Sequence, residues 1–232
     1  MAHTRLAREG PIVTVTLDRP ERRNALSDPL LAELEAAFAG LRDDATTRVV
    51  IVTGAPPVFS AGADAPLRRG MSPEERRRTF QARKSQFRRL FERVNTLLEN
   101  LEQATVAAIG LTLACDFRWA AAEAELWIPE VDLGVPLGVG TTTRLVRLVG
   151  PARAKEVIME GRRYTATEAQ TLGLVHRVVP AAQLLDAVRE YARQLAAKPF
   201  RPLAEVKARV NAIARVGIPE ANAMTEGFLD RE

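Results

Sequence analysis

Cysteine and histidine, which supply disulfides, zinc ligands and catalytic bases, are scarce in this sequence. Cys115 is the only cysteine, and the 232 residues include two histidines. One thiol cannot form an intrachain disulfide or provide a cysteine cluster for zinc. His3 lies at a terminus expected to fray, and His176 has neither a nucleophile nor a carboxylate indicated nearby. We therefore predict no metal site and no Ser-His-Asp triad.

Long apolar runs are also missing. No run reaches the roughly 18–20 residues needed to span a bilayer, and the first residues lack the apolar core of a secretory signal. These absences predict a cytoplasmic protein that does not associate with a membrane.

Aromatic residues are few, at 5% of the chain, and no RNA-binding aromatic signature is present. The net charge is nevertheless +4, and much of the positive charge falls between Arg68 and Arg89. Such a stretch fits a partner that carries phosphate, either a cofactor or a nucleic acid. It also fits a solvated helix face. The shortage of aromatic residues disfavours nucleic acid.

Strand and helix patterns alternate along most of the chain, which predicts an α/β fold. The opening β-α-β pattern favours parallel pairing with a right-handed crossover. Residues 1–180 form the predicted α/β core, and residues 181–232 form a helical region that is expected to pack on the core or on a neighbouring subunit. Predicted strands cover residues 12–17, 49–53, 105–109, 117–122, 125–128 and 174–179; predicted helices begin near residues 28, 72, 141, 151, 165 and 181.

A stretch of small residues, Ala61, Gly62 and Ala63, follows the apolar strand at 49–53. After Asp64 the chain is expected to turn helical. A strand, a small-residue loop and a helix start together aim backbone N–H groups into one place. Such a group of donors suits a developing oxyanion, although ordinary turn chemistry gives the same local pattern.

Six short motifs, taken in order, resemble those of the crotonase, or enoyl-CoA hydratase/isomerase, family. The resemblance implies a crotonase-like spiral of β-β-α units with a helical C-terminal region that builds trimers or dimers of trimers. It implies an enzyme of fatty acid metabolism whose substrate is an acyl-CoA thioester, with CoA carried in by the substrate and no other cofactor. The motifs lie at residues 19–26, 59–64, 114–118, 128–136, 144–150 and 173–180.

The resemblance also implies roles for particular residues. The backbone N–H of Ala63 would stabilise a thioester enolate, and Glu130 would move a proton at the substrate. The alternative for Glu130 is that it has no catalytic role and is a surface glutamate after a strand. Residues implied to line the CoA and the thioester are Ala25, Leu26, Ala61, Ala63, Asp64, Ala65 and Pro66.

Two departures from the family pattern leave the reaction open. Only Gly110 stands between Ile109 and Leu111, where the family has a glycine-rich turn with a second N–H and a first glutamate. We expect an omitted loop there, because such a join is shorter than usual connections. The chain also stops at Glu232, before the family's last helices.

Hydration in the family uses two glutamates, whereas a double-bond shift can proceed with one. Hydratase and isomerase therefore both remain possible. The alternative is a family member that binds acyl-CoA or RNA without turnover. A glutamate just before Leu111 in a longer sequence would support a hydratase.

Overall fold

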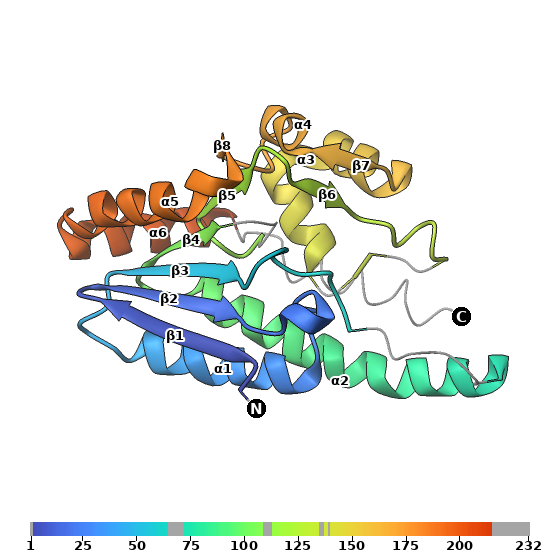
Figure 1. Cartoon of the computed structure of the whole chain (residues 1–232). Helices are drawn as coiled ribbons and strands as arrows, with labels where there is room; N and C mark the ends of the chain where they lie inside the picture. Colours follow the sequence, from blue (N-terminus) through green and yellow to red (C-terminus); the bar gives the residue numbers. More distant parts are fainter. Residues whose placement is uncertain (1, 65–71, 109–112, 135–136, 139, 215–232) are drawn as a thin grey trace.

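The computed structural model describes residues 2–64, 72–108, 113–134, 137–138 and 140–214 (Figure 1). A main sheet has the strand order β1-β2-β3-β4-β5-β8, and β6 pairs with β7 in a separate small sheet. The strands are β1 (Thr4–Glu9), β2 (Ile12–Leu17), β3 (Val49–Gly54), β4 (Ala104–Ala108), β5 (Phe117–Ala121), β6 (Glu125–Trp127), β7 (Arg163–Thr165) and β8 (Arg177–Val179). The helices are η1 (Pro20–Arg22), α1 (Asp28–Arg42), α2 (Pro73–Glu99), α3 (Thr141–Glu160), α4 (Ala166–Thr171), α5 (Ala181–Ala196) and α6 (Phe200–Ala214).

The main sheet is parallel from β2 to β8, and β1 is added antiparallel at its edge. Every residue of β3 is buried, as expected for a parallel strand that is covered on both faces. Val50 and Val52 pack into one core with α1 and α2, whereas Val49 and Ile51 pack into a second core with α5. Helices α1 and α2 therefore lie on one face of the sheet and α5 on the other (Figure 1).

A third core lies where α3 and α4 meet the small sheet. The buried side chains of Leu145, Val157 and Tyr164 belong to it. Helix α3 is interrupted by Gly150, whose φ of 76° and ψ of 165° are not helical. The two helices predicted at 141–149 and 151–159 are therefore two parts of one kinked element.

The helical region was expected to pack on the core or on a neighbouring subunit, and α5 packs on the core, where Leu184, Val188 and Leu195 are buried against β3, β4 and β5. The expectation that no strand is left for its apolar side to cover is wrong. The following helix, α6, has no buried residue at all. An uncovered apolar face therefore belongs to α6.

Other boundaries differ in smaller ways. Strand β1 had no predicted counterpart, and β8 occupies only the last part of the strand predicted at 174–179. Helix α2 begins at Pro73 and so does not follow directly after Asp64. The expected helix start beside Ala63 falls at residues 65–71, outside the described part of the chain. None of the described helices is long and apolar enough to cross a membrane.

Candidate active site

Two loops that follow strands β2 and β3 are joined by backbone hydrogen bonds. Leu26 N donates to Gly62 O at 2.8 Å, and Asp64 N donates to Leu26 O at 2.8 Å. Ala61 N donates to Arg23 O at 2.9 Å. Together these bonds form a short parallel bridge between Leu26 and Ala63. The small-residue loop is therefore held as part of a sheet-like pair.

This bridge leaves the backbone N–H of Ala63 free. In a parallel bridge one residue makes both hydrogen bonds, and here that residue is Leu26. The N–H of Ala63 therefore points away from Leu26, and it has no acceptor among the described residues. Ala61, Gly62 and Ala63 are all exposed, so a ligand can approach the donor.

The side chain of Asn24 holds the loops after β2 and β3 together. It is fully buried, and its Nδ2 donates to Ala55 O at 2.7 Å and to Val58 O at 2.6 Å. Its Oδ1 accepts from Arg19 N at 2.9 Å. One amide thus connects the segment after β2 to the segment after β3. The sequence analysis placed Asn24 in a motif but did not predict this role.

Ser60 extends the same network to the loop itself. Its Oγ donates to Asn24 O at 2.9 Å and accepts from Gly62 N at 3.1 Å. Since Gly62 directly precedes Ala63, the position of the free N–H depends on Asn24 through Ser60.

The carboxylate of Asp64 is held between two arginines. Arg19 Nη1 and Arg22 Nη2 each lie 3.1 Å from one of its oxygens. Arg19 Nη1 also donates to Ala25 O at 2.7 Å. Asp64 and Ala25, both predicted to line a ligand, are therefore tied to one another through Arg19. Ala65 and Pro66 lie outside the described residues.

Glu130 lies in a turn just after β6 and is half-buried. Its Oε2 is shielded from solvent and has no hydrogen-bond partner among the described residues. Burial raises the pKa of Glu130, and a hydrogen bond from its own backbone offsets only part of this rise. A partly desolvated carboxyl group with one unpartnered oxygen is suited to exchange a proton with a ligand.

The remaining predicted residues do not complete the site. No hydrogen bond or ion pair joins Glu130 to the loop at 61–64 within the described part of the chain. Residues 109–112, where a second N–H was expected, lie outside that part. Arg68 and Arg69 of the basic stretch lie outside it too. Within its described residues, the structure thus shows one backbone N–H without an acceptor, at Ala63, and one buried carboxylate oxygen without a partner, at Glu130.

Comparison with known proteins identifies the family. A family model described as enoyl-CoA hydratase/isomerase matches residues 7–228. The chain belongs to the enoyl-CoA hydratase/isomerase family. It is an enzyme of this type, and its fold is the crotonase fold.

Individual members of the enoyl-CoA hydratase/isomerase family are similar over most of the chain. A crotonyl-CoA hydratase of Syntrophomonas wolfei is 34% identical over 203 residues, which cover 83% of this chain and 75% of the relative. The crystal structure of an enoyl-CoA hydratase from Bacillus anthracis is 34% identical with a TM-score of 0.82 and covers 98% of this chain and 89% of that one. The crystal structure of a monofunctional enoyl-CoA isomerase from M. smegmatis is 28% identical with a TM-score of 0.74, and the match covers 92% of this chain and 94% of that one. Hydratases and an isomerase are thus both among the similar proteins.

Proposed function

We propose that the protein binds an enoyl-CoA thioester with its carbonyl oxygen at the N–H of Ala63 and moves a substrate proton with Glu130. The observation that carries this proposal is the buried Oε2 of Glu130, which has no partner among the described residues. An unpaired carboxylate oxygen is costly to bury. It is retained where a ligand or a proton completes its environment.

The free N–H of Ala63 supplies the electrostatic part of the mechanism. Removal of a proton next to a thioester carbonyl places negative charge on the carbonyl oxygen. A fixed N–H donor stabilises that charge at no cost in reorganisation, because the bridge to Leu26 has already oriented it. Loss of one such donor typically lowers kcat by about 10²–10³-fold.

Glu130 supplies the proton transfer. In a double-bond shift, its carboxylate takes the proton from the α carbon of a 3-enoyl-CoA, and the electron pair moves onto the thioester oxygen. The same carboxyl group then returns the proton to the γ carbon. One carboxyl group can complete this cycle, whereas hydration additionally needs a water molecule to be activated at the β carbon. The carboxyl group of Glu130 is thus sufficient in itself for the double-bond shift, and hydration would use it together with a second group that activates water.

The CoA moiety is assigned to the two joined loops. Ala61, Gly62 and Ala63 are exposed, whereas Ala25 is buried and Leu26 is partly buried. The Arg19–Asp64 ion pair holds the two loops together. The residues that we assign to CoA binding are Ala25, Leu26, Ala61, Ala63 and Asp64, with Ala65 and Pro66 as the continuation of the loop.

Substitution Glu130→Gln tests the proposal. Gln keeps the size of the side chain but cannot take up a proton, so turnover of a 3-enoyl-CoA or a 2-enoyl-CoA should fall by about 10²–10⁴-fold. The dissociation constant of the substrate should change little, because the Ala63 donor is untouched. Steady-state kinetics and calorimetric titration measure the two quantities.

Glu125→Gln is the matched control. Glu125 lies in β6, is exposed and pairs with Arg163 at 2.9 Å. Its substitution should leave turnover within about twofold, since exposed ion pairs contribute little. Equal turnover by Glu130→Gln and wild type would show that Glu130 is structural. Absence of turnover in wild type would favour a protein that only binds acyl-CoA.

The pH profile provides a further test of Glu130. The base is the ionised form, so activity falls as the pH decreases through the pKa of Glu130. Because burial raises this pKa above 4.5, the acid limb of kcat/KM should lie above pH 4.5. An acid limb at or below that value would contradict the assignment.

A further inference from the structure

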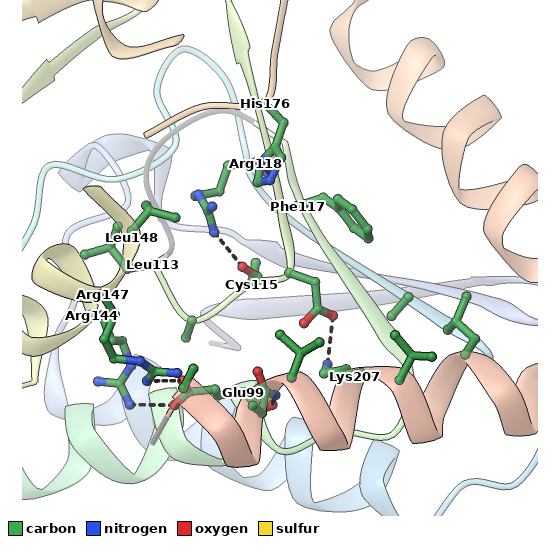
Figure 2. Close-up of a pocket in the computed structure, with 18 of the residues that line it drawn as sticks. Glu99, Leu113, Cys115, Phe117, Arg118, Arg144, Arg147, Leu148, His176 and Lys207 are labelled. Atoms are coloured by element: carbon green, nitrogen blue, oxygen red, sulfur yellow. Dashed lines mark hydrogen bonds and ion pairs between the residues drawn. The ribbon is translucent and has the colours of Figure 1, made fainter. Parts of the chain in front are cut away.

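A cavity lies away from the Ala63 loop. It has a volume of about 740 Å³ and lies between α6, the first half of α3 and the segment that leads into β5 (Figure 2). Pockets of this size commonly hold small molecules. Glu130 and residues 61–64 are not among the described residues that line it. The cavity is thus separate from the proposed active site.

Arg118, at the start of β5, forms the most unusual part of the wall. Only 3% of it is exposed, and its Nε and Nη1 donate to the carbonyl oxygens of Leu174 and Cys115 at 2.9 and 2.6 Å. No carboxylate forms a direct ion pair with it among the described residues, although the charge of Asp116 favours the protonated guanidinium. Burial disfavours its charge and lowers its pKa. A buried guanidinium without a direct ion pair is costly, and this one lines an open cavity.

The other charges around the cavity are largely balanced. Glu99 pairs with Arg144 at 3.1 Å and with Arg147 at 3.2 Å. Asp116 pairs with Lys207 at 2.8 Å. Figure 2 shows Arg144 and Arg147 directed toward Glu99, well apart from Arg118. The buried positive charge left for an anion is therefore that of Arg118.

Between these charged groups the wall is apolar. Leu113 and Leu148 lie between Arg118 and the arginines of α3 (Figure 2). On the opposite side, α6 contributes Val206 and Val210, which are 61% and 59% exposed although they line the cavity. An apolar chain placed here would remove their surface from water, at about 25 cal/mol per Å².

Helix α6 is held over the cavity by polar contacts. Lys207 Nζ donates to Gln103 O at 2.9 Å in addition to pairing with Asp116, and Asn211 Nδ2 donates to Glu99 O at 3.1 Å. None of its residues is buried. The helix thus covers a space that its apolar side chains do not fill.

We propose that this cavity binds a carboxylate with an apolar tail, such as a medium-chain fatty acid. The carboxylate accepts hydrogen bonds from the guanidinium of Arg118, whose planar donors match a carboxylate. The tail lies along Leu148 of α3 and Val206 and Val210 of α6. The site requires neither Ala63 nor Glu130, and so it does not depend on the proposed function.

Calorimetric titration of the full chain with decanoate tests this site. We expect saturable binding of one decanoate per chain. Decanol lacks the charge and acetate lacks the tail, so each should bind at least roughly tenfold more weakly. No saturable binding of decanoate would overturn the proposal. If decanol bound as tightly as decanoate, the role of Arg118 would be overturned. If acetate bound as tightly as decanoate, the role of the apolar wall would be overturned.

Val206→Asp places a negative charge on the tail path at a surface position of α6. It should weaken decanoate binding by roughly tenfold or more. Ala208→Asp is the matched control, since Ala208 is exposed on the same helix and is not among the lining residues. Equal effects of the two variants would contradict the assignment. Circular dichroism checks that both remain folded.

Arg118→Gln removes the proposed counter-charge and should abolish the preference for decanoate over decanol. Saturating 2-enoyl-CoA should leave decanoate binding unchanged. Competition between the two would place decanoate in the acyl-CoA site and overturn the proposal. Loss of decanoate binding as the chain self-associates would assign the cavity to a second copy instead.

Discussion

Asn24 is fully buried, has a backbone φ of 52°, and uses its side-chain amide to connect two segments of the chain through three hydrogen bonds. A positive φ is uncommon outside glycine, but asparagine tolerates it better than most residues. The amide also matches its surroundings, because it donates to two carbonyl oxygens and accepts from one N–H. Few other side chains satisfy all of these demands.

Replacement Asn24→Asp should destabilise the protein by at least about 2 kcal/mol. The carboxylate keeps the acceptor for Arg19 N but leaves Ala55 O and Val58 O without donors, beside a buried negative charge. Urea denaturation, followed by circular dichroism, measures the change in free energy of unfolding.

Asn100→Asp is the control for this change. Asn100 is exposed, and its amide donates only to Thr96 O at the end of α2. It should cost less than about 1 kcal/mol, mainly through a negative charge near a helix C-terminus. Similar losses for both variants would show that the buried amide of Asn24 has no special role.

The sequence could place Asn24 in a motif but could not show what its side chain does. Its acceptors, Ala55 O and Val58 O, lie 31 and 34 residues away along the chain. They are backbone atoms, which leave no signature in residue type. The same holds for Arg118, whose carbonyl partners, and whose lack of a direct ion pair within the described part of the chain, emerge only from the fold. By contrast, the loop at 61–63 could be located in the sequence because small residues after a buried strand are a local pattern, and Ala63 was singled out within it by the resemblance to the family.

At the scale of elements, helix α3 shows how one residue shapes a helix. Gly150 separates two helical parts with φ 76° and ψ 165°, a conformation that is essentially restricted to glycine. Pro151 follows it and begins the second part, as proline does at the first turn of a helix. The sequence indicated both parts from the glycine–proline break, although not the bend between them.

Gly150→Ala should cost about 1–3 kcal/mol, because alanine is strained at this positive φ. Gly40→Ala in α1 is the matched change at a glycine with ordinary helical geometry, and it should stabilise by about 0.5–1 kcal/mol. An added Cβ meets no atom within 4 Å at either position. The difference therefore isolates backbone conformation, and thermal unfolding of both variants measures it. Effects of the same sign would contradict this explanation.

Strand β1 was missed because it lacks the burial pattern by which strands are usually found. Five of its six residues are exposed, and the sixth is only partly buried. Its pairing partner β2, in contrast, is almost wholly buried and was predicted. The strand that contains β8 was predicted to begin too early, at residue 174. Leu174 and Val175 are apolar and buried, as strand residues often are, but they pack into the third core ahead of β8.

At the scale of the whole molecule, the α/β order and the helical end of the chain were predictable from periodicity. The sequence could not predict which helix keeps an uncovered apolar face, because α5 and α6 have similar patterns and only packing distinguishes them. Leu184 and Val188 of α5 are buried in the second core, whereas Ile213 of α6 is 75% exposed. Contacts between copies are thus better sought on α6.

We expect the full chain to form trimers in solution, with the end of α6 around Ile213 at the contact, since Ile213 is exposed and is not among the described residues that line the cavity. Sedimentation equilibrium at micromolar concentration should give three times the mass of one chain. Ile213→Asp should shift the population toward monomers, since burying an unpaired charge in an interface is unfavourable. A monomeric mass for the unaltered chain would contradict this prediction.

The exposed edge of the main sheet limits how copies can assemble. A free strand edge is a template on which other chains can add, as in amyloid. Here β1 carries Arg5, Arg8 and Glu9, and the two arginines are paired with Asp18 and Asp44 of the same chain. A strand added beside β1 would have to desolvate or displace these ion pairs. Growth by strand addition is therefore disfavoured at this edge, and association through helices remains open.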